Sequence, residues 1–153
     1  MPAAAARIHF TGRIEHDDLP HLLPFCKALV MPSTFPEAFG MVAAEAAACG
    51  VLPLAAGHSG MAEVTATLAP ALPNELQSLL SFEIGPAAVE QIAAKLVAWL
   101  TLDDAERERA SLALAHEAAR RYSWKNVAKG VIAAAQGRLD MLPSPPANIL
   151  HAP

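Results

Sequence analysis

Two short apolar runs constrain the fold of this chain more than any other feature of its sequence. ALVMP covers residues 28–32 and VLPLAA covers residues 51–56. Each has the length and apolar character of a strand buried in a parallel sheet, although Pro53 is unfavourable within a strand. Between them lies GMVAAEAAACG at 40–50, whose alanines favour a helix and whose Gly50 stands where helices commonly end. Strand, loop, helix and strand in this order predict a parallel α/β sheet.

The rest of the chain predicts further elements of the same kind. RIHF at 7–10 is expected to be a strand, 17–27 a short helix, and SGMAEVT to open a helix at 59. Residues 67–85 are ambiguous, because Pro70 and Pro73 interrupt them. Beyond them, apolar spacings of three and four predict amphipathic helices at 86–100 and 103–122, followed by a helix capped by Ser123.

The fold class is therefore expected to be α/β, with a Rossmann-like parallel sheet flanked by helices and a helical C-terminal segment. Residues 1–141 would form this domain, and residues 142–153 a proline-rich flexible tail. About three strands are visible, whereas sheets average about five or six. We expect the chain to be a piece of a larger protein, or its sheet to be completed by another subunit in a homo-oligomer.

Composition limits the kind of partner. The net charge is −4 and the sequence pI about 5.8, which predicts no basic face for nucleic acid or for an anionic membrane. No apolar run reaches the roughly 18 residues of a membrane-spanning helix, and the N-terminus does not resemble a signal peptide. Cys26 and Cys49 are expected to be small buried thiols in a reducing compartment. Together these features predict a cytoplasmic protein that binds a small molecule or another protein.

Two glutamates, Glu37 and Glu45, stand in an otherwise apolar and small-residue segment, PSTFPEAFGMVAAEAAACG at 32–50. Ligands of open α/β sheets bind beyond the carboxyl ends of the strands, where the loop after residue 32 should lie. The free N–H groups at the start of the following helix, around Phe39, Gly40 and Met41, would form an anion site suited to a diphosphate. Gly40 would let the ligand approach the backbone closely.

The spacing of the two carboxylates favours a ligand with neutral hydroxyls on both sides of that diphosphate. Glu37 precedes the anion site and Glu45 lies more than one helical turn beyond it, so they cannot bind the same group. A carboxylate would repel a phosphate but accepts hydroxyl hydrogen bonds well. We therefore expect a nucleotide sugar, with Glu45 on the ribose diol and Glu37 on the sugar hydroxyls.

The segment from HFTGRIEHDD to GHSGMAEV resembles the C-terminal, donor-binding half of retaining GT-B glycosyltransferases (the group 1, or family 4, type). The matching features are the F-x-G of Phe10 and Gly12, the seven-residue spacing of Glu37 and Glu45, and the glycine-containing loop from Gly57 to Val64. RRYSWKNVAKGVI also resembles the C-terminal helix of that family. The resemblance covers roughly residues 7–65 and 121–136.

This resemblance implies roles for individual residues. Glu37 would be the catalytic residue, contacting the transferred hexose in the transition state rather than attacking it. The backbone at Phe39, Gly40 and Met41 would meet sugar and phosphate oxygens, and Glu45 would bind ribose. The remaining donor-binding residues would be those at the base, Gly12, Arg13 and Ile14, and those at the sugar-phosphate end, Ser59 and Gly60. It implies no metal and no cofactor beyond the donor.

The sequence also departs from the pattern of that family. The arginine and lysine that would neutralise the departing diphosphate, and the N-terminal domain that would bind the acceptor, would precede residue 7. The loop GHSGM has His58 and Met61 where Gly-Gly is commoner. We therefore expect the isolated chain to bind nucleoside diphosphates weakly without transferring sugar. The alternatives are a non-catalytic nucleotide-sugar-binding module, an inactive fragment, or a GT-B nucleotide-sugar epimerase.

Three other patterns favour simpler interpretations. Ser59 follows a strand and precedes a helix, like a hydrolase nucleophile, but Met61 stands where that motif needs glycine. His16 and His21 miss the spacing that would place them on one helical face for a metal. Trp99 and Trp124 are expected to pack in a core or domain contact rather than to stack on a ligand.

Overall fold

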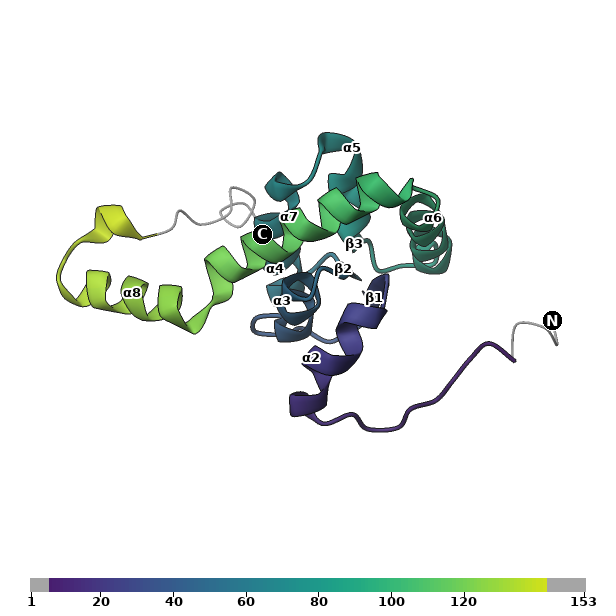
Figure 1. Cartoon of the computed structure of the whole chain (residues 1–153), viewed down its shortest axis with the longest axis horizontal. Coiled ribbons are helices and arrows are strands. Elements are labelled where there is room, and N and C mark those ends of the chain that lie inside the picture. Colours follow the sequence, from purple (N-terminus) through teal and green to yellow (C-terminus); the bar gives the residue numbers. More distant parts are fainter. Residues whose placement is uncertain (1–5, 143–153) are drawn as a thin grey trace.

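The computed structural model describes residues 6–142, which form a parallel sheet covered by helices. The sheet order is β1-β2-β3, with β1 at Ala28–Met31, β2 at Leu52–Ala56 and β3 at Ser81–Phe82. Both pairs are parallel, and the helices surround the sheet in Figure 1. The predicted α/β, Rossmann-like class with a helical C-terminal segment is confirmed. The predicted flexible tail was residues 142–153, and all of it from residue 143 onward lies outside the described residues.

The helices follow the strands in the predicted order. Their bounds are α2 Leu19–Leu22, α3 Met41–Ala48, α4 Ser59–Leu68, α5 Asn74–Gln77, α6 Ala88–Leu100, α7 Asp104–Tyr122 and α8 Trp124–Ala135. Single 3₁₀ turns stand at η1 His16–Asp18, η2 Leu23–Phe25, η3 Ala69–Ala71, η4 Ser78–Leu80 and η5 Leu139–Met141. Gly50, just beyond α3, has the positive φ of 73° that commonly ends a helix.

The central strand β2 is buried at all five residues, although it contains a proline. Leu52 N–H bonds toward β1, to Lys27 O, whereas Gly57 N–H bonds toward β3, to Phe82 O. The backbone N–H groups of odd-numbered residues in β2 therefore point toward β3. Position 53 is odd-numbered, so the nitrogen of Pro53 also lies on the β3 side. Pairing with β3 begins only at Ala55, opposite Ser81. The missing N–H of Pro53 thus falls where no strand needs it, which explains how a proline is tolerated here.

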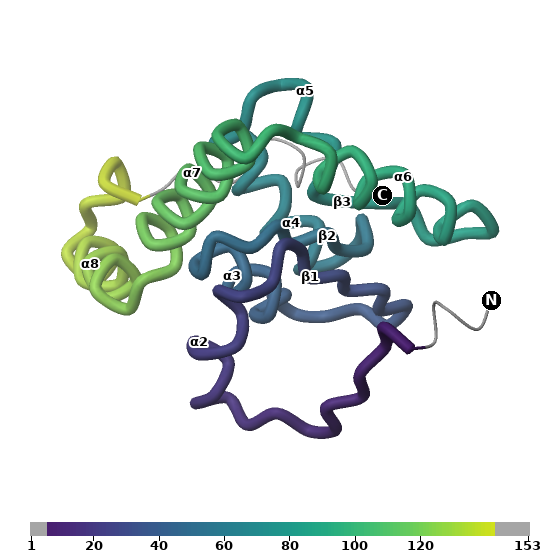
Figure 2. The backbone as a smooth tube through the Cα atoms, turned by 45° about the vertical axis from the view of Figure 1, so that its right-hand side comes forward, coloured from purple at the N-terminus to yellow at the C-terminus, as the bar shows by residue number. Residues whose placement is uncertain are grey.

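The predicted strand at 7–10 is wrong. This segment has no regular structure, and its apolar side chains, Ile8 and Phe10, are 60% and 96% exposed. In Figure 2 the chain from residue 6 swings away from the sheet and returns to it only at α2. The third strand is instead β3, within the ambiguous stretch, and among the described residues no strand pairs with the outer edge of β1.

The long helices α6 and α7 were predicted correctly, and they close the core. Asp103 caps α7, because its Oδ1 accepts the Glu106 N–H at 2.8 Å. Leu114 and Ala118 of α7 join the same buried cluster as the alanines of α3. Small side chains on α3 let the two helices approach closely, so α7 lies directly on α3 (Figure 1).

Trp99 of α6 is fully buried, as expected. Trp124 at the start of α8 is 88% exposed, so it does not pack in the core, and a domain contact stays a prediction for it. Ser123 precedes α8 as predicted, but its side chain makes no capping hydrogen bond. Within residues 6–142, no helix combines the length and the apolar character needed to cross a bilayer.

The two tryptophans provide a matched test of the core. Trp99 Nε1 donates to Lys27 O at 2.8 Å and thereby joins α6 to the start of β1. Trp99→Phe should lower the free energy of unfolding by about 1–3 kcal/mol, because it removes this hydrogen bond and leaves part of the space of a fully buried indole empty. Trp124→Phe should change it by less than about 0.5 kcal/mol, since that side chain is exposed. Urea denaturation measures both, and equal costs would contradict the structure.

Candidate functional site

The loops that follow β1 and β2 are held together by hydrogen bonds on the backbone of Glu37. Glu37 N–H donates to Ser59 Oγ at 3.0 Å, and Glu37 O accepts the Gly60 N–H at 2.8 Å. A third tie joins His58 Nε2 to Ser33 O at 2.9 Å. Because the strands are parallel neighbours, both loops leave the same edge of the sheet. The half-buried Glu37 is thus fixed at that edge through its own backbone.

Two glycines allow this close approach. A Cβ on Gly60 would stand 2.4 Å from Phe39 N and 2.5 Å from its Cα, so no larger residue fits without a shift. A Cβ on Gly40 would stand 3.0 Å from Met61 Cα, and the φ of Gly40 is +77°. The predicted site residues Phe39, Gly40 and Gly60 therefore lie against one another.

Ser59 has the only positive φ of a non-glycine residue in the part of the chain that the structure describes, +52°. This conformation is strained for a residue with a side chain, and the hydrogen bond from Glu37 N–H helps to hold it. Among residues 6–142, no histidine hydrogen-bonds to Ser59 Oγ. The side chain therefore positions the neighbouring loop and lacks the base that a serine nucleophile needs.

The first turn of α3 begins beside Glu37. Gly40 precedes the helix, and the N–H groups of Met41 and Val42 have no backbone acceptor within the described range. No acidic residue stands in this first turn, so the positive end of the helix dipole is uncompensated there. This end of α3 can bind an anion.

Glu45, one turn further along α3, is held by a contact that the sequence does not predict. His16 Nε2 lies 3.0 Å from Glu45 Oε1 and joins η1 to α3. The hydrogen bond and the charge of Glu45 raise the pKa of His16. The other carboxylate oxygen has no hydrogen bond to a described side chain and can accept a further donor.

Gly12, Arg13 and Ile14 lie in the exposed segment that precedes η1. Arg13 pairs with Glu15 at 3.0 Å, and Gly12 has a φ of +68° in open space. Within residues 6–142, no hydrogen bond or ion pair joins these three residues to residues 37–45. Their nearest link to the site is through His16.

An apolar cavity of about 590 Å³ opens between α3, the end of α7 and the start of α8. Phe39, Met41 and Glu45 line it from α3 and the loop before it, and Tyr122 and Trp124 line it from the other side. The rings of Phe39 and Tyr122 meet edge to face, with centroids 5.3 Å apart and an interplanar angle of 85°. The sequence indicated the side of the cavity formed by Tyr122 and Trp124 through its aromatic-Ser-Trp segment. The contact of Tyr122 with Phe39 was not predicted.

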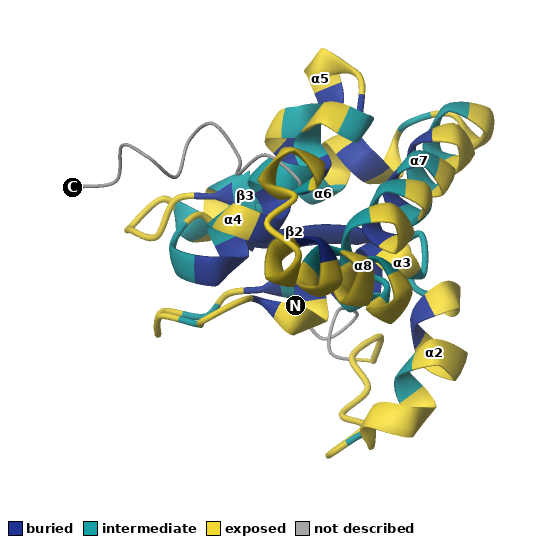
Figure 3. Ribbon diagram, turned by 90° about the vertical axis from the view of Figure 1, so that its left-hand side faces the viewer, coloured by how far each residue is buried: buried dark blue, intermediate teal, exposed yellow. Residues whose placement is uncertain are grey.

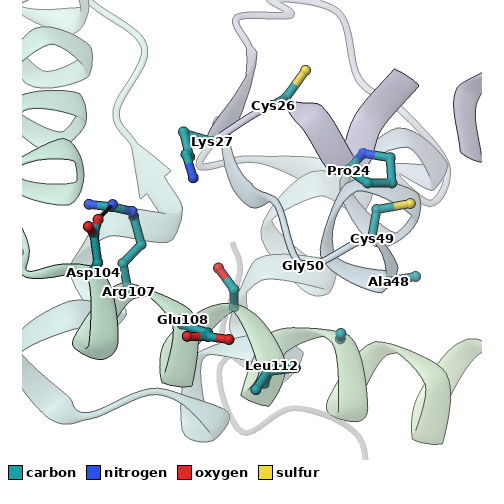
Figure 4. Close-up of a pocket in the computed structure, with 12 residues that line it drawn as sticks. Pro24, Cys26, Lys27, Ala48, Cys49, Gly50, Asp104, Arg107, Glu108 and Leu112 are labelled. Carbon is teal, nitrogen blue, oxygen red and sulfur yellow. Dashed lines mark hydrogen bonds and ion pairs between the residues drawn. The ribbon is translucent and has the colours of Figure 1, made fainter. Parts of the chain in front are cut away.

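A second cavity, of about 570 Å³, lies at the opposite end of α3 and shares none of the predicted site residues. Figure 4 shows its mixed lining, with Cys26, Cys49 and the ion pair of Arg107 with Asp104. Both cysteines are free and half-buried, which corrects the expectation of buried thiols. Burial, and then the charge of Glu45, raise the pKa of Cys49, so its thiol is a weak nucleophile. No group of three metal-ligating side chains occurs within the described residues.

The close contact at Gly60 gives a direct test of the loop arrangement. Gly60→Ala should lower the free energy of unfolding by about 1–3 kcal/mol, because its Cβ would collide with the Phe39 backbone. Gly85→Ala is the control, since a Cβ there meets nothing within 4 Å. Thermal or urea denaturation measures both. Equal stability of the two variants would show that the loops are not packed as described.

The contact of His16 with Glu45 should be visible as a pH dependence. Because the folded pKa of His16 is raised, this contact stabilises the fold fully below the unfolded value of about 6.5. That contribution disappears as the pH rises through the folded pKa. In an NMR titration, Glu45→Gln should lower the pKa of His16, whereas Glu63→Gln on α4 should leave it unchanged. If the pKa of His16 were the same in Glu45→Gln as in the wild type, the contact would be contradicted.

Comparison with known proteins identifies a family for this chain. The family model for glycosyl transferases group 1 matches residues 3–113, which is most of the chain. No curated protein and no solved structure matches the chain significantly. The matched range includes both loops, α3 and Glu45, and ends within α7. The chain therefore belongs to the glycosyl transferases group 1 family and is a transferase domain of the GT-B type.

Proposed function

We propose that this chain binds the donor of the transfer reaction, a nucleoside diphosphate hexose, at the start of α3. The observation that carries the proposal is the double hydrogen bond on the backbone of Glu37. It fixes the backbone that carries the Glu37 carboxylate, four residues before the free N–H group of Met41 at the start of α3. A sugar hydroxyl and a phosphate require this combination of neighbours.

The diphosphate is assigned to the first turn of α3. The N–H groups of Met41 and Val42 are the donors, and Gly40 allows the phosphate to approach the backbone. The helix dipole contributes up to about 2 kcal/mol in such a partly buried site. The same dipole favours the charge that collects on the leaving diphosphate in the transition state.

Glu37 is assigned to the hydroxyls of the transferred sugar. Its backbone cannot swing away, because Ser59 and Gly60 hold it from both sides. A carboxylate on a fixed backbone can orient the sugar with little reorganisation of the loop during the reaction. Ser59 and Gly60 thereby serve the site through Glu37, and they approach the sugar-phosphate end of the donor.

Glu45 is assigned to the ribose diol. His16 occupies one of its carboxylate oxygens and fixes the direction of the other. The backbone of Gly12, Arg13 and Ile14, which His16 connects to α3, is assigned to the base. A donor that reached both Glu45 and this segment would cover part of the solvent-exposed surface of residues 12–14.

We propose that transfer retains the configuration of the sugar. The bond from the anomeric carbon to the diphosphate breaks, a bond to the acceptor oxygen forms on the same face, and a phosphate oxygen takes the acceptor proton. Glu37 stabilises the oxocarbenium-like state and forms no covalent intermediate. An earlier loop and helix that carry an arginine and a lysine, and an N-terminal domain with the acceptor site, would complete the reaction. The chain alone is therefore expected to bind the donor without turnover.

Calorimetry with the chain and matched ligands tests these roles. Glu45→Ala should weaken binding of nucleoside diphosphates and of their hexose conjugates by about 1.5–3 kcal/mol alike, since it removes hydrogen bonds to a charged group. Glu37→Ala should leave the affinity for the bare diphosphate unchanged and abolish any preference for the sugar conjugate. Glu90→Ala on α6 is the control. Wild-type affinity in Glu45→Ala, or a sugar preference that survives Glu37→Ala, would reject the corresponding role.

A further inference from the structure

A third cavity, of about 490 Å³, lies between the end of α7, one side of α8 and η5. None of its lining residues belongs to the candidate donor site. In Figure 3, α8 is mostly coloured as exposed, so this end of the molecule is open to solvent. The cavity is therefore a separate and accessible part of the surface.

The lining of this cavity is basic. It contains four cationic side chains, Arg120, Arg121, Lys129 and Arg138, and among the described residues no acidic side chain lines it. The four come from the end of α7, from α8 and from the turn before η5. The fold, and not a continuous run of basic residues, thus collects positive charge here in a chain whose net charge is −4.

Two backbone features bring the walls of this basic cavity together. Gly137 has a φ of +72°, and the Arg138 N–H donates to Ala133 O at 2.9 Å, so the chain reverses after α8 and returns beside it. On the other side, Asn126 Nδ2 donates to Arg120 O at 2.9 Å and joins α8 to the end of α7. The positions of the cations are therefore set by the fold.

Glu117, outside the lining, holds two of the cations in place. Arg120 Nε donates to its carboxylate at 2.7 Å, and Arg121 Nε donates at 3.0 Å. The hydrogen bond from Arg120 is the main cause of the lowered pKa of Glu117, so this carboxylate stays ionised. One carboxylate fixes two guanidinium groups but offsets only one of the four charges.

The other two cations lack a carboxylate partner in the part of the chain that the structure describes. Arg138 donates to the neutral Gln136 Oε1 and, at 3.2 Å, to Met141 Sδ. A thioether sulfur is a weak acceptor, and Lys129 is exposed without an ion pair. An oxyanion would be a stronger acceptor for both side chains.

The lining favours phosphate among the oxyanions. Guanidinium groups match the geometry of phosphate oxygens, and a phosphate presents three acceptor oxygens on one dianionic group, whereas a carboxylate presents two. The remaining wall is partly apolar, with Ile132, Met141 and Leu142, and offers contacts to a carbon skeleton. The volume lies within the range of pockets for small molecules.

We propose that this basic cavity binds a small phosphate monoester. The phosphate lies between Lys129 and Arg138 and faces the guanidinium groups that Glu117 holds, and the organic part lies against the apolar wall. The cavity lies beyond residues 3–113, so it does not follow from the family match, and it does not depend on the proposed donor site.

An NMR titration of the full chain tests the proposal, with inorganic phosphate and a hexose 6-phosphate as probes at constant ionic strength. Both should shift the amide resonance of Gly130, which lines the cavity, in a saturable way, and the unphosphorylated hexose should not. A saturating nucleoside diphosphate should leave this response unchanged, because the amide of Gly40 reports the donor site separately. The hexose phosphate should also raise the unfolding midpoint.

A double variant and two controls locate the binding. Lys129→Gln with Arg138→Gln should weaken the affinity for the hexose phosphate about tenfold, because two partly exposed ion pairs are lost. Lys125→Gln, on the same helix but outside the lining, and Arg109→Gln on α7 should bind as the wild type does. All four substituted side chains are exposed, and unfolding midpoints confirm that each variant is folded.

Several outcomes would overturn the proposal. One is the absence of a saturable response at Gly130, and another is equal weakening by the double variant and the controls. If the phosphates shifted Gly40 alone, anions would bind only at the start of α3, which would reject this cavity and leave the donor site standing. Sedimentation with vesicles that contain phosphatidic acid, without any response to the soluble probes, would assign the cations to a lipid headgroup instead.

Discussion

The structure depends on β2 being a buried middle strand between two parallel neighbours. Its five residues are all buried, so both faces require helices, and α3 and α4 must start at the same edge of the sheet. That edge brings the loop of Glu37 against the turn of Ser59 and Gly60. The candidate site is therefore a consequence of strand pairing. Its precision comes from glycines, because Gly40 and Gly60 remove the side chains that would keep the two loops apart.

The sequence predicted the elements that carry a strong local pattern and missed those that depend on neighbours. α3, α6 and α7 have clear helical composition or periodicity, and each was confirmed. The run at 7–10 has the same alternation as a strand, but no partner lies beside it, and a strand requires one. β3 has two residues in a proline-interrupted segment, which is too short to show any period. Pro53 is tolerated because its side of β2 is unpaired at that level.

The candidate site could be predicted only for residues that are close together in the sequence. Phe39, Gly40 and Met41 belong to one loop and helix start, so finding the helix places all three. The contact between His16 and Glu45 spans 29 residues and joins two side chains, and no local pattern encodes it. The edge-to-face contact of Phe39 with Tyr122 spans a still longer separation. Net charge was equally uninformative about α8, because an average over the whole chain conceals a basic end on an acidic domain.

The two ends of the molecule are physically connected through the apolar cavity. Phe39 and Met41 belong to the donor loop, Trp124 and Val127 to the exposed face of α8, and all four line the same space. The edge-to-face contact of Phe39 with Tyr122 lies between them, so a movement of α8 against α7 would act on the ring beside Gly40. Coupling between two sites requires a shared element with two arrangements, each favoured by one ligand. The Phe39–Tyr122 pair is the contact in this structure through which a partner of α8 and a donor at α3 would have to influence each other.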